Sequence, residues 1–501
     1  MRRGIRLAPH LWSLHVHGRR LITSLAVGAL LLFIVTSVAS LASAAPVSSS
    51  RSVISWSPCP KVTGYDCGSL QVPIDYGHPS RGSLALAVIE HPVPDSKGVI
   101  VFNPGGPGES GVLILPILAA LVPASVRSHF TLVSFDERGT GSSDPLLCGP
   151  SPAAAGSAVT GTQSAITTFA GLDRSCRSRY PKLFPTVDTT TSARDMDSLR
   201  VALGVDRINY YGVSYGTVLG SVYRQLFPTH VRAMVLDGAV DANLSLPTDA
   251  TLEAPAIQTA LEHALSNCQV TSGCALGSSP IASFEQLVAR LTRTPLPAPG
   301  DGDDDPVTVG DLMTATLLYL SAPAFTPAYF PALAAATDGD GAPLRSVALD
   351  LESDLNGNSL VGALWTITCN DAAAHPNGAA TAALARTLAA RFPLGGAEAV
   401  ANNLVGCPGW TGSTGVISHL VPLRSHPPLV IGNTYDPNTP YAAARRLAPT
   451  VGGRLVTYVG YGHSWLLNGS TNVCMDGVVT AYLIHDVLPA SGTRCVASGG
   501  G

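Results

Sequence analysis

The chain has 501 residues, of which 46% are apolar and 13% charged, and its formal net charge is −4 at pH 7. This composition allows a sizeable core and excludes an intrinsically disordered chain. Basic residues form no stripe and do not alternate with aromatic residues, so the sequence carries no signature of nucleic-acid binding. The length leaves two arrangements open, either about two to four domains or a large α/β domain with an insertion.

The N-terminus predicts an export signal. Arginines precede an apolar run from Leu21 to about Ala39, and Ala42-Ser43-Ala44 forms a small-x-small cleavage motif before Ala45. The run is long enough to span a bilayer, so an uncleaved anchor is the competing interpretation. The cleavage motif favours removal of residues 1–44. We therefore expect a secreted or envelope-associated protein outside the cytoplasm, with no stable membrane span after cleavage.

Ten cysteines follow the predicted signal, and an even number in an exported chain favours disulfides. Many connectivities are open. The simplest joins neighbours in the sequence, because each bond then closes a short loop: Cys59–Cys67, Cys148–Cys176, Cys268–Cys274, Cys369–Cys407 and Cys474–Cys495. The chain has no CxxC pair, and its acidic run at 301–305 lacks the later residues of a calcium loop. We therefore expect no metal and no cofactor.

Strands and helices alternate between residues 98 and 240. Two strands, Leu70–Val72 and Ser83–His91, precede this region. A buried strand over Gly98–Asn103 then leads into the cluster Pro104–Gly108 and an apolar helix from Gly111. Further strands are predicted at Phe130–Phe135, Ile208–Tyr211 and Val231–Asp237, and a helix at Thr191–Leu203. This alternation predicts a mostly parallel sheet with helices on both faces.

The pattern changes between residues 241 and 415. Ala/Leu-rich segments with helical spacing, such as Ile281–Leu291 and Val309–Leu320, are broken by Pro/Gly loops. We interpret 241–415 as a helical cap inserted into an α/β core that comprises 45–240 and 416–501. The core resumes with a strand at Pro428–Gly432, a last strand at Arg454–Val459 and a closing helix near Val478–His485.

The segment Tyr211-Gly-Val-Ser-Tyr-Gly lies between a predicted strand and an apolar helix, Thr217–Phe227. Gly-x-Ser-x-Gly in this context predicts a nucleophile elbow. Ser214 would occupy a strained turn, and Gly212 and Gly216 lack the Cβ atoms that would clash there. So short a pattern also recurs by chance in Gly/Ser loops, and the flanking strand and helix favour the elbow.

Two further residues complete a catalytic triad in the order that such an elbow requires. Asp436 and His463 each follow a predicted strand, and they come after Ser214 as acid and then histidine. His463 would take the proton from Ser214, and Asp436 would orient the imidazole. The amides of Gly106 and Tyr215 would bind the oxyanion. We interpret the polar cluster at 136–143 as a structural turn beside this site.

Several segments together carry a family resemblance. They are Asn103-Pro-Gly-Gly-Pro-Gly, Phe135-Asp-Glu-Arg-Gly-Thr-Gly-Ser-Ser, Tyr211-Gly-Val-Ser-Tyr-Gly-Thr, Val235-Leu-Asp-Gly, Ile367-Thr-Cys-Asn-Asp, Asp436-Pro-Asn-Thr-Pro and Gly462-His463. The chain resembles the secreted tripeptidyl aminopeptidases, which are proline-iminopeptidase-like α/β-hydrolases of bacteria. Two residues depart from the family pattern: Glu109, where a small residue is frequent, and Glu137, where proline is usual.

This resemblance implies an α/β-hydrolase fold with an inserted helical cap and an exported serine exopeptidase. The enzyme would act on peptides with a free N-terminus through an acyl-enzyme and release tripeptides. An extracellular esterase or lipase would use the same triad and is the alternative. A non-catalytic binding protein on this fold is a further alternative, which the intact triad disfavours.

An aminopeptidase must hold a protonated α-amine at a fixed distance from Ser214, which calls for a carboxylate in a partly desolvated pocket. Asp371 is the first candidate, because it follows an apolar run and a predicted disulfide cysteine, Cys369. Glu109 is the second candidate, because it is attached to the predicted oxyanion loop. Its closeness to Ser214 makes a three-residue spacing harder to accommodate.

Overall fold

The computed structural model describes residues 53–150, 162–270, 274–298, 306–354, 358–412, 415, 417, 419–468 and 472–497. These residues belong to the unit Arg51–Gly501. The predicted signal at 1–44 and the acidic run at 301–305 lie outside them. Among the described residues no helix has both the length and the apolarity to cross a membrane. Their His, Cys, Asp and Glu side chains form no group of three or more that could hold a metal ion.

The described strands form a ten-stranded mixed sheet with the order β1-β2-β3-β5-β4-β6-β7-β8-β9-β10. Their bounds are β1 Ser57–Pro58, β2 Asp66–Pro73, β3 Ser83–His91, β4 Val99–Asn103, β5 Thr131–Phe135, β6 Ile208–Val213, β7 Val231–Asp237, β8 Leu429–Tyr435, β9 Arg454–Tyr461 and β10 Arg494–Val496. Pairing is antiparallel from β1 to β5 and parallel from β5 to β10. The predicted, mostly parallel sheet is therefore confirmed.

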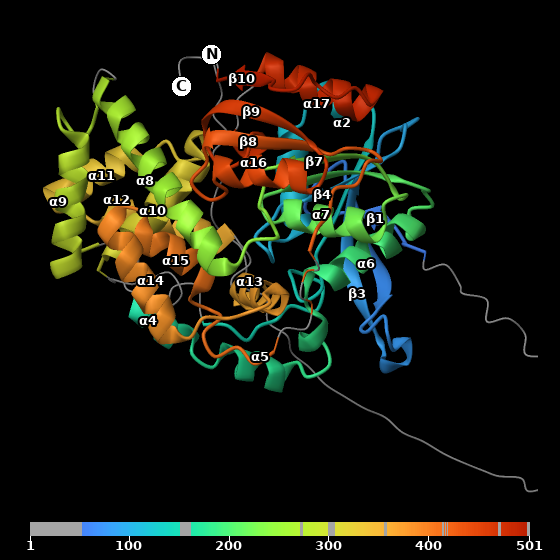
Figure 1. The fold of residues 1–501 in the computed structure, drawn as a ribbon, viewed down its shortest axis with the longest axis horizontal. Coiled ribbons are helices and arrows are strands. Elements are labelled where there is room, and N and C mark those ends of the chain that lie inside the picture. Colours follow the sequence, from blue (N-terminus) through green and yellow to red (C-terminus); the bar gives the residue numbers. More distant parts are fainter. Residues whose placement is uncertain are drawn as a thin grey trace, which may run out of the picture. The chain divides into compact units, whose positions relative to one another are not determined.

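Helices cover both faces of this sheet (Figure 1). One face packs against α6 (Thr189–Ala202), α7 (Gly216–Leu226) and α16 (Tyr441–Thr450). The other face packs against α1 (Gly111–Leu121), the short α2 (Ala124–Arg127) and α17 (Val473–His485). Successive strand residues point to opposite faces, so in β4 Val101 joins the first cluster and Ile100 the second. The central strands are rich in apolar residues because both of their faces are buried.

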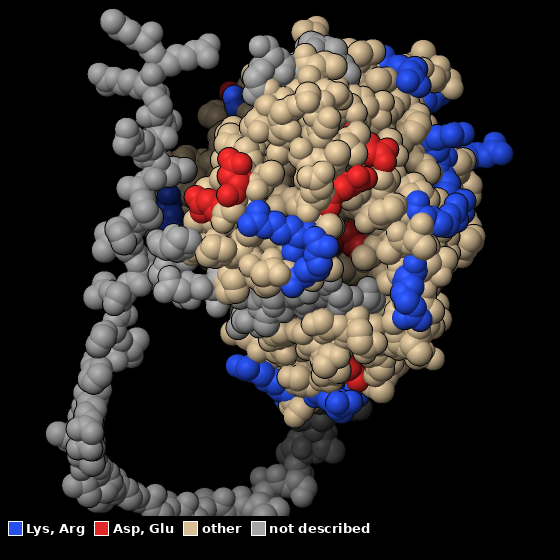
Figure 2. Space-filling model, turned by 90° about the vertical axis from the view of Figure 1, so that its left-hand side faces the viewer, with Lys and Arg blue, Asp and Glu red and all other residues tan. Residues whose placement is uncertain are grey.

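Helices fill the chain between β7 and β8. They are α8 Leu246–Val270, α9 Pro280–Arg293, α10 Val309–Ser321, α11 Tyr329–Asp338, α12 Ala342–Asp354, α13 Asn358–Asp371, α14 Gly378–Arg391 and α15 Gly396–Leu404. They lie to one side of the sheet in Figure 1 and pack on one another through apolar clusters of their own. Figure 2 shows the face on this side, where acidic and basic side chains both lie on a largely uncharged surface.

Two helices from earlier in the chain join this helical layer. Helices α4 (Thr162–Phe169) and α5 (Leu172–Arg179) share an apolar cluster with α13 and α15, which includes Phe169, Trp365 and Ala401. The layer thus includes residues outside the range 241–415. The division of the chain into a core and a separate cap domain stays a prediction. Short 3-10 turns occupy Pro79–Arg81, Phe184–Thr186, Pro323–Phe325 and Leu466–Asn468.

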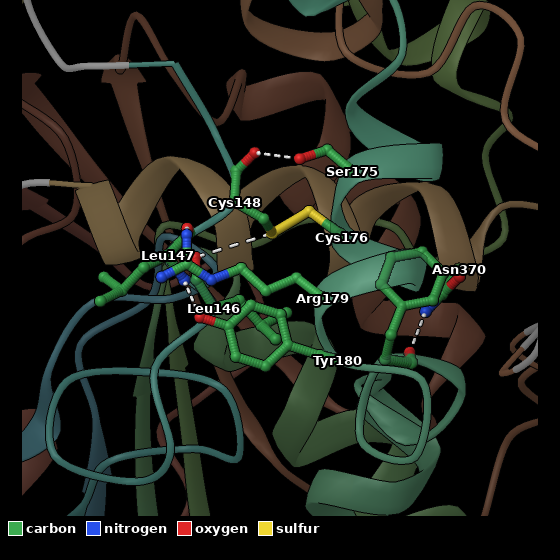
Figure 3. The surroundings of a disulfide bond; sticks show 9 residues. Leu146, Leu147, Cys148, Ser175, Cys176, Arg179, Tyr180 and Asn370 are labelled. Carbon is green, nitrogen blue, oxygen red and sulfur yellow. Dashed lines mark hydrogen bonds between the residues drawn. A yellow bond between two sulfur atoms is a disulfide. The ribbon is translucent and has the colours of Figure 1, made fainter.

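The predicted pairing of neighbouring cysteines is confirmed, and none of the ten cysteines is free. Figure 3 shows the bond Cys148–Cys176, which joins the segment after β5 to α5. Hydrogen bonds reinforce this junction. The Leu147 N–H donates to the Tyr180 hydroxyl at 3.0 Å, and the Arg179 guanidinium donates to the Leu147 carbonyl at 2.8 Å. The loop after β5 is therefore fixed against the helical layer.

The prediction that Arg454–Val459 is the last strand and that a helix closes the fold is wrong. Strand β10 follows α17 and pairs in parallel with β9, with Cys495 opposite Tyr458. The disulfide Cys474–Cys495 joins the strand to α17. A three-residue edge strand has too little sequence pattern to reveal it, because its pairing depends on contacts made after folding.

Candidate active site

Ser214 lies in the turn between β6 and α7, with φ 56°, in the left-handed region that side chains rarely adopt. The flanking glycines make this turn possible. A Cβ on Gly212 would lie 2.3 Å from the Gly216 carbonyl oxygen, and a Cβ on Gly216 would lie 2.8 Å from the Asn103 carbonyl oxygen. The Ser214 N–H donates to the Asp237 carbonyl at 2.9 Å. The residue as a whole is partly exposed on this strained turn.

The loop Pro104–Gly108 lies directly against the Ser214 turn. A Cβ on Gly105 would lie 2.8 Å from the Ser214 Cβ and 2.7 Å from the Val213 carbonyl oxygen. The loop can approach this closely only because Gly105 has no side chain. Gly105 and Gly106 both have positive φ, at 109° and 103°, and Gly106 is exposed. Backbone amides of this loop thus border the space in front of Ser214.

Tyr215 supplies the other predicted oxyanion donor. It is the N-cap residue of α7, so its amide belongs to a helix N-terminus, where partial positive charge favours a developing anion. Its ring is buried, with 7% of the residue exposed. The sequence-predicted donors Gly106 and Tyr215 therefore come from two segments that pack against each other at Ser214.

His463 and Asp436 come together from the loops after β9 and β8. The His463 Nδ1 lies 3.0 Å from Asp436 Oδ1, and both residues are buried. Asp436 also accepts the N–H groups of Asn438, Thr439 and Ser464 at 2.8–3.0 Å. With Nδ1 donating to the carboxylate, Nε2 is the ring nitrogen left to accept a proton. This is the tautomer that a general base needs.

Charges around His463 favour its protonated form. Burial lowers the pKa of its imidazole, but the Asp436 charge and hydrogen bond, with smaller contributions from Glu109 and Asp237, raise the pKa above its ordinary value. Glu109 is the neighbour on the Pro104–Gly108 side. Burial raises the pKa of its carboxyl to about 7, although the charge of His463 opposes this shift. Glu109 and His463 therefore interact electrostatically: the charge of each favours the ionised form of the other.

Sequence reasoning did not identify Asp237 as a residue of the candidate site. It ends β7, is fully buried, and accepts the N–H groups of Trp465 and Leu466 at 2.8 and 2.9 Å. The Tyr211 hydroxyl donates to it at 2.8 Å. Asp237 thus fixes the chain just after His463 to the strand beside the Ser214 turn. An acid at the end of a buried strand, in the segment Val235-Leu-Asp-Gly, is the sequence signal that could have identified it.

The structure brings Asp371 close to Tyr215. Asp371 ends α13, and its Oδ1 and Oδ2 accept the N–H and the hydroxyl of Thr189, the first residue of α6, at 3.0 and 2.5 Å. The Thr189 hydroxyl in turn lies 2.6 Å from the Tyr215 hydroxyl. Burial, followed by the charge of Asp188, holds the pKa of Asp371 well above its usual range.

The residues next to Asp371 hold it in place. Cys369 is bonded to Cys407, as predicted. Asn370, visible in Figure 3, donates to the carbonyls of Phe184 and Val187 at 3.2 and 3.0 Å. It also accepts from the Trp410 indole N–H at 3.1 Å. The end of α13 is therefore held by one disulfide and by three hydrogen bonds of Asn370.

Comparison with known proteins identifies the family of the chain. The model of a family described as "alpha/beta hydrolase fold" matches residues 98–470. "Serine protease Hip1" of Mycobacterium tuberculosis is 33% identical over 479 residues, which covers 88% of this chain and 91% of the relative. "Carboxylesterase B" of the same organism is 30% identical over 455 residues, with 86% of each chain covered. "Tripeptidyl aminopeptidase" of Streptomyces lividans is 36% identical over 220 residues, or 40% of this chain and 41% of the relative.

Proposed function

This chain belongs to the α/β-hydrolase family, and on that premise we propose that it is an exported serine peptidase that removes tripeptides from free N-termini.

 The observation that carries the proposal is that Ser214, the Pro104–Gly108 loop and the hydrogen-bonded pair His463–Asp436 all follow strands of the parallel series β4-β6-β7-β8-β9, at the carboxyl ends of those strands. The 33% identity to a named serine protease across 88% of the chain supports peptide substrates.

In this proposal the Ser214 Oγ attacks the scissile carbonyl carbon while His463 Nε2 takes the hydroxyl proton. The carbonyl oxygen becomes an oxyanion, which the amides of Gly106 and Tyr215 stabilise by about 3 kcal/mol per donor. When the carbon–nitrogen bond breaks, His463 returns the proton to the leaving amine and the acyl group stays on Ser214. Water, activated by His463, then hydrolyses the ester. Asp436 holds the imidazole in the required tautomer throughout.

In this proposal an acidic side chain near the site binds the free α-amine of the substrate. Asp371 remains our first candidate. Both of its oxygens accept from Thr189, but each carboxylate oxygen has a second lone pair that can accept from an ammonium group. Glu109 is the second candidate, because its carboxyl is close enough to His463 for their charges to interact. A bound ammonium beside either acid would favour the ionised carboxylate.

A carboxylic ester hydrolase is the second candidate function. The identity of 30% to a relative named carboxylesterase B, over 86% of this chain, favours it. Its chemistry would use the same nucleophile, base and oxyanion donors, so the acyl-transfer machinery alone does not separate it from a peptidase.

The test is to incubate the mature protein with free peptides, N-blocked peptides and acyl esters, and to identify the products by mass. The variant Ser214→Ala, expressed and purified in the same way, serves as the control for contaminating hydrolases. Tripeptides released from free peptides alone would support the proposal. Turnover of esters without any cleavage of free peptides would overturn it in favour of the esterase.

Export is part of the proposal. The five disulfides agree with folding in an oxidising compartment. We expect the mature chain to begin near Ala45, which the intact mass of the protein recovered outside the cell would test. A mature protein that retains residues 1–44 would instead indicate an N-terminal anchor.

A further inference from the structure

Glu137 is a fully buried carboxyl group behind the candidate oxyanion hole, with 0% of the residue exposed. It follows β5, and its two oxygens have different partners. Oε1 accepts from the Asn103 side-chain amide at 3.0 Å, and Oε2 accepts from the Tyr215 hydroxyl at 3.3 Å. Both partners are neutral, so this carboxyl group is not held as half of an ion pair by either of them.

The Asn103 contact leads to the oxyanion loop. Asn103 is the last residue of β4, and its Oδ1 accepts the N–H of Gly105 at 3.1 Å. A Cβ on Gly216 would lie 2.8 Å from the Asn103 Oδ1, so this side chain also packs against the start of α7. Glu137 is therefore connected, by hydrogen bonds through Asn103, to the loop that carries Gly106.

The Tyr215 contact leads to the other donor. The Tyr215 hydroxyl lies between Glu137 and the Thr189 hydroxyl, which is 2.6 Å away. Because the ring is buried, fixing the hydroxyl also fixes the orientation of the residue whose amide faces the oxyanion. One carboxyl group is thus hydrogen-bonded on both sides of the hole.

The neighbours of Glu137 already anchor the turn in which it lies. The Arg138 guanidinium forms a fully buried ion pair with Asp195 at 2.6 Å and donates to the carbonyls of Pro73 and Ile74. Asp136 accepts from the Ser110 hydroxyl at 2.6 Å and from the Ser142 N–H at 2.7 Å. The hydrogen bonds of Glu137 to Asn103 and Tyr215, in contrast, connect it to the two segments that carry the oxyanion donors.

We propose that Glu137 is a positioning residue whose carboxyl group, by joining Asn103 to Tyr215, fixes the separation of the two amides that bind the oxyanion. The inference rests on the proposed function, since an oxyanion hole acts only in acyl transfer. Donors that are already oriented need no reorganisation as charge develops, so loosening them slows the chemical step more than it weakens substrate binding.

The test compares Glu137→Ala, Glu137→Gln and Tyr215→Phe with the unmodified protein. The readouts are kcat, KM and the inhibition constant of a peptidyl trifluoromethyl ketone, whose tetrahedral adduct carries an oxyanion. For Glu137→Ala we expect kcat to fall by about 10- to 100-fold and the inhibition constant to rise in proportion, with KM changed less than about threefold. Glu137→Gln should recover most of the loss, because an amide can accept from Asn103 and donate to the Tyr215 oxygen.

Glu90→Gln is the matched control. Glu90 lies on β3, and burial also raises the pKa of its carboxyl, but the residue is outside this set of contacts. If Glu137→Ala does not fold, Tyr215→Phe keeps the test open, since it removes one of the two contacts and should raise the inhibition constant about 5- to 10-fold with KM unchanged.

If Glu137→Ala folds and its inhibition constant is unchanged, the assignment of Glu137 is overturned. If Glu137→Ala does not fold, an unchanged inhibition constant in Tyr215→Phe overturns it. Equal changes in kcat for Glu137→Ala and Glu90→Gln would do the same. Failure of the proposed function has a different signature: the unmodified protein would turn over no ester or peptide, and a fluorophosphonate would not label Ser214. In that case the protein would have no working oxyanion hole, and the role proposed for Glu137 would be rejected together with the proposed function.

Discussion

The backbone N–H of His463 donates to the carbonyl oxygen of Ser321, with 2.7 Å between the two atoms. Ser321 is the last residue of α10, and its hydroxyl accepts from the Asn438 side chain at 2.9 Å. The end of one helix between β7 and β8 thus contacts both the loop that carries the candidate base and the loop that carries the candidate acid. The packing of α10 therefore helps to fix the positions of the two loops that bring His463 and Asp436 together.

Ser321→Ala should remove the Asn438 contact and leave the carbonyl bond to His463 intact. We expect the free energy of unfolding to fall by about 0.5–1.5 kcal/mol, the usual net contribution of one hydrogen bond. Urea unfolding followed by tryptophan fluorescence would measure the change. Stability equal to that of the unmodified protein would mean that water replaces the Ser321 hydroxyl as the partner of Asn438 at no cost.

Ser214→Ala should fold normally and lose several orders of magnitude in kcat, because only the oxyanion donors and substrate binding would remain. His463→Ala should approach the same loss, and the double variant should add little to either single change. Steady-state rates on one peptide substrate measure all three variants. Strictly additive losses would indicate a base other than His463.

Asp436→Asn should move the acid limb of the pH–rate profile to lower pH. The Asp436 charge and hydrogen bond raise the pKa of His463 against the opposing effect of burial, and the reaction needs the neutral imidazole. Activity therefore rises with pH through this pKa, and removing the charge lowers it. The kcat itself should drop by about 10⁴-fold, as when the corresponding acid of a serine protease is replaced. An acid limb at the original pH would contradict the assignment.

Asp371→Asn tests amine recognition. If Asp371 binds the α-amine, free-amine peptides should lose roughly 2–5 kcal/mol of transition-state binding, as for a charge left unpaired in a buried site. N-blocked or ester substrates should lose almost nothing. The ratio of kcat/KM values for matched free and blocked substrates gives the answer. Equal losses would show that Asp371 only anchors Thr189, and Glu109→Gln should then be tested in the same way.

Replacing Cys369 and Cys407 by serine should destabilise the protein. The bond closes a loop with a sequence separation of 38, for which chain entropy gives about 4 kcal/mol. A lower midpoint in urea unfolding would confirm the effect. Replacing Cys59 and Cys67, which are only 8 residues apart, is the matched control and should cost less.

The sequence predicted the elements around the candidate site because their signals are local. Strand β6 ends in Gly212-Val213 just before Ser214, and Gly216 starts α7 just after it. Asp436 directly follows β8, and His463 lies in the loop after β9. The contacts of Glu137 and Asp237 were missed for the opposite reason. Each depends on partners brought together by the sheet, such as Tyr215, which is 78 residues from Glu137. The spacing of these residues in the sequence does not predict that they are in contact.

Helix α13 illustrates the same limit. Its segment Ile367-Thr-Cys-Asn-Asp contributed to the family resemblance, and the position of Cys369 suggested that Asp371 is held in place. That Asp371 accepts from the first residue of α6 could not be read from either segment alone. The contact joins Thr189 and Asp371, which are 182 positions apart in the sequence.

The direct pairing of β7 with β8 has a consequence for protein engineering. Asp237 stands opposite Ile431, so the long helical segment leaves one strand and returns to its immediate neighbour. A chimera could therefore exchange all the helices between these two strands with those of a relative, using the sheet register as the splice point. Ser214, Asp436 and His463 would keep their positions in such a hybrid, provided that the donor segment supplies a carbonyl where Ser321 meets His463. The substrate range could then be changed by exchanging the helical segment, while the candidate catalytic residues stay the same.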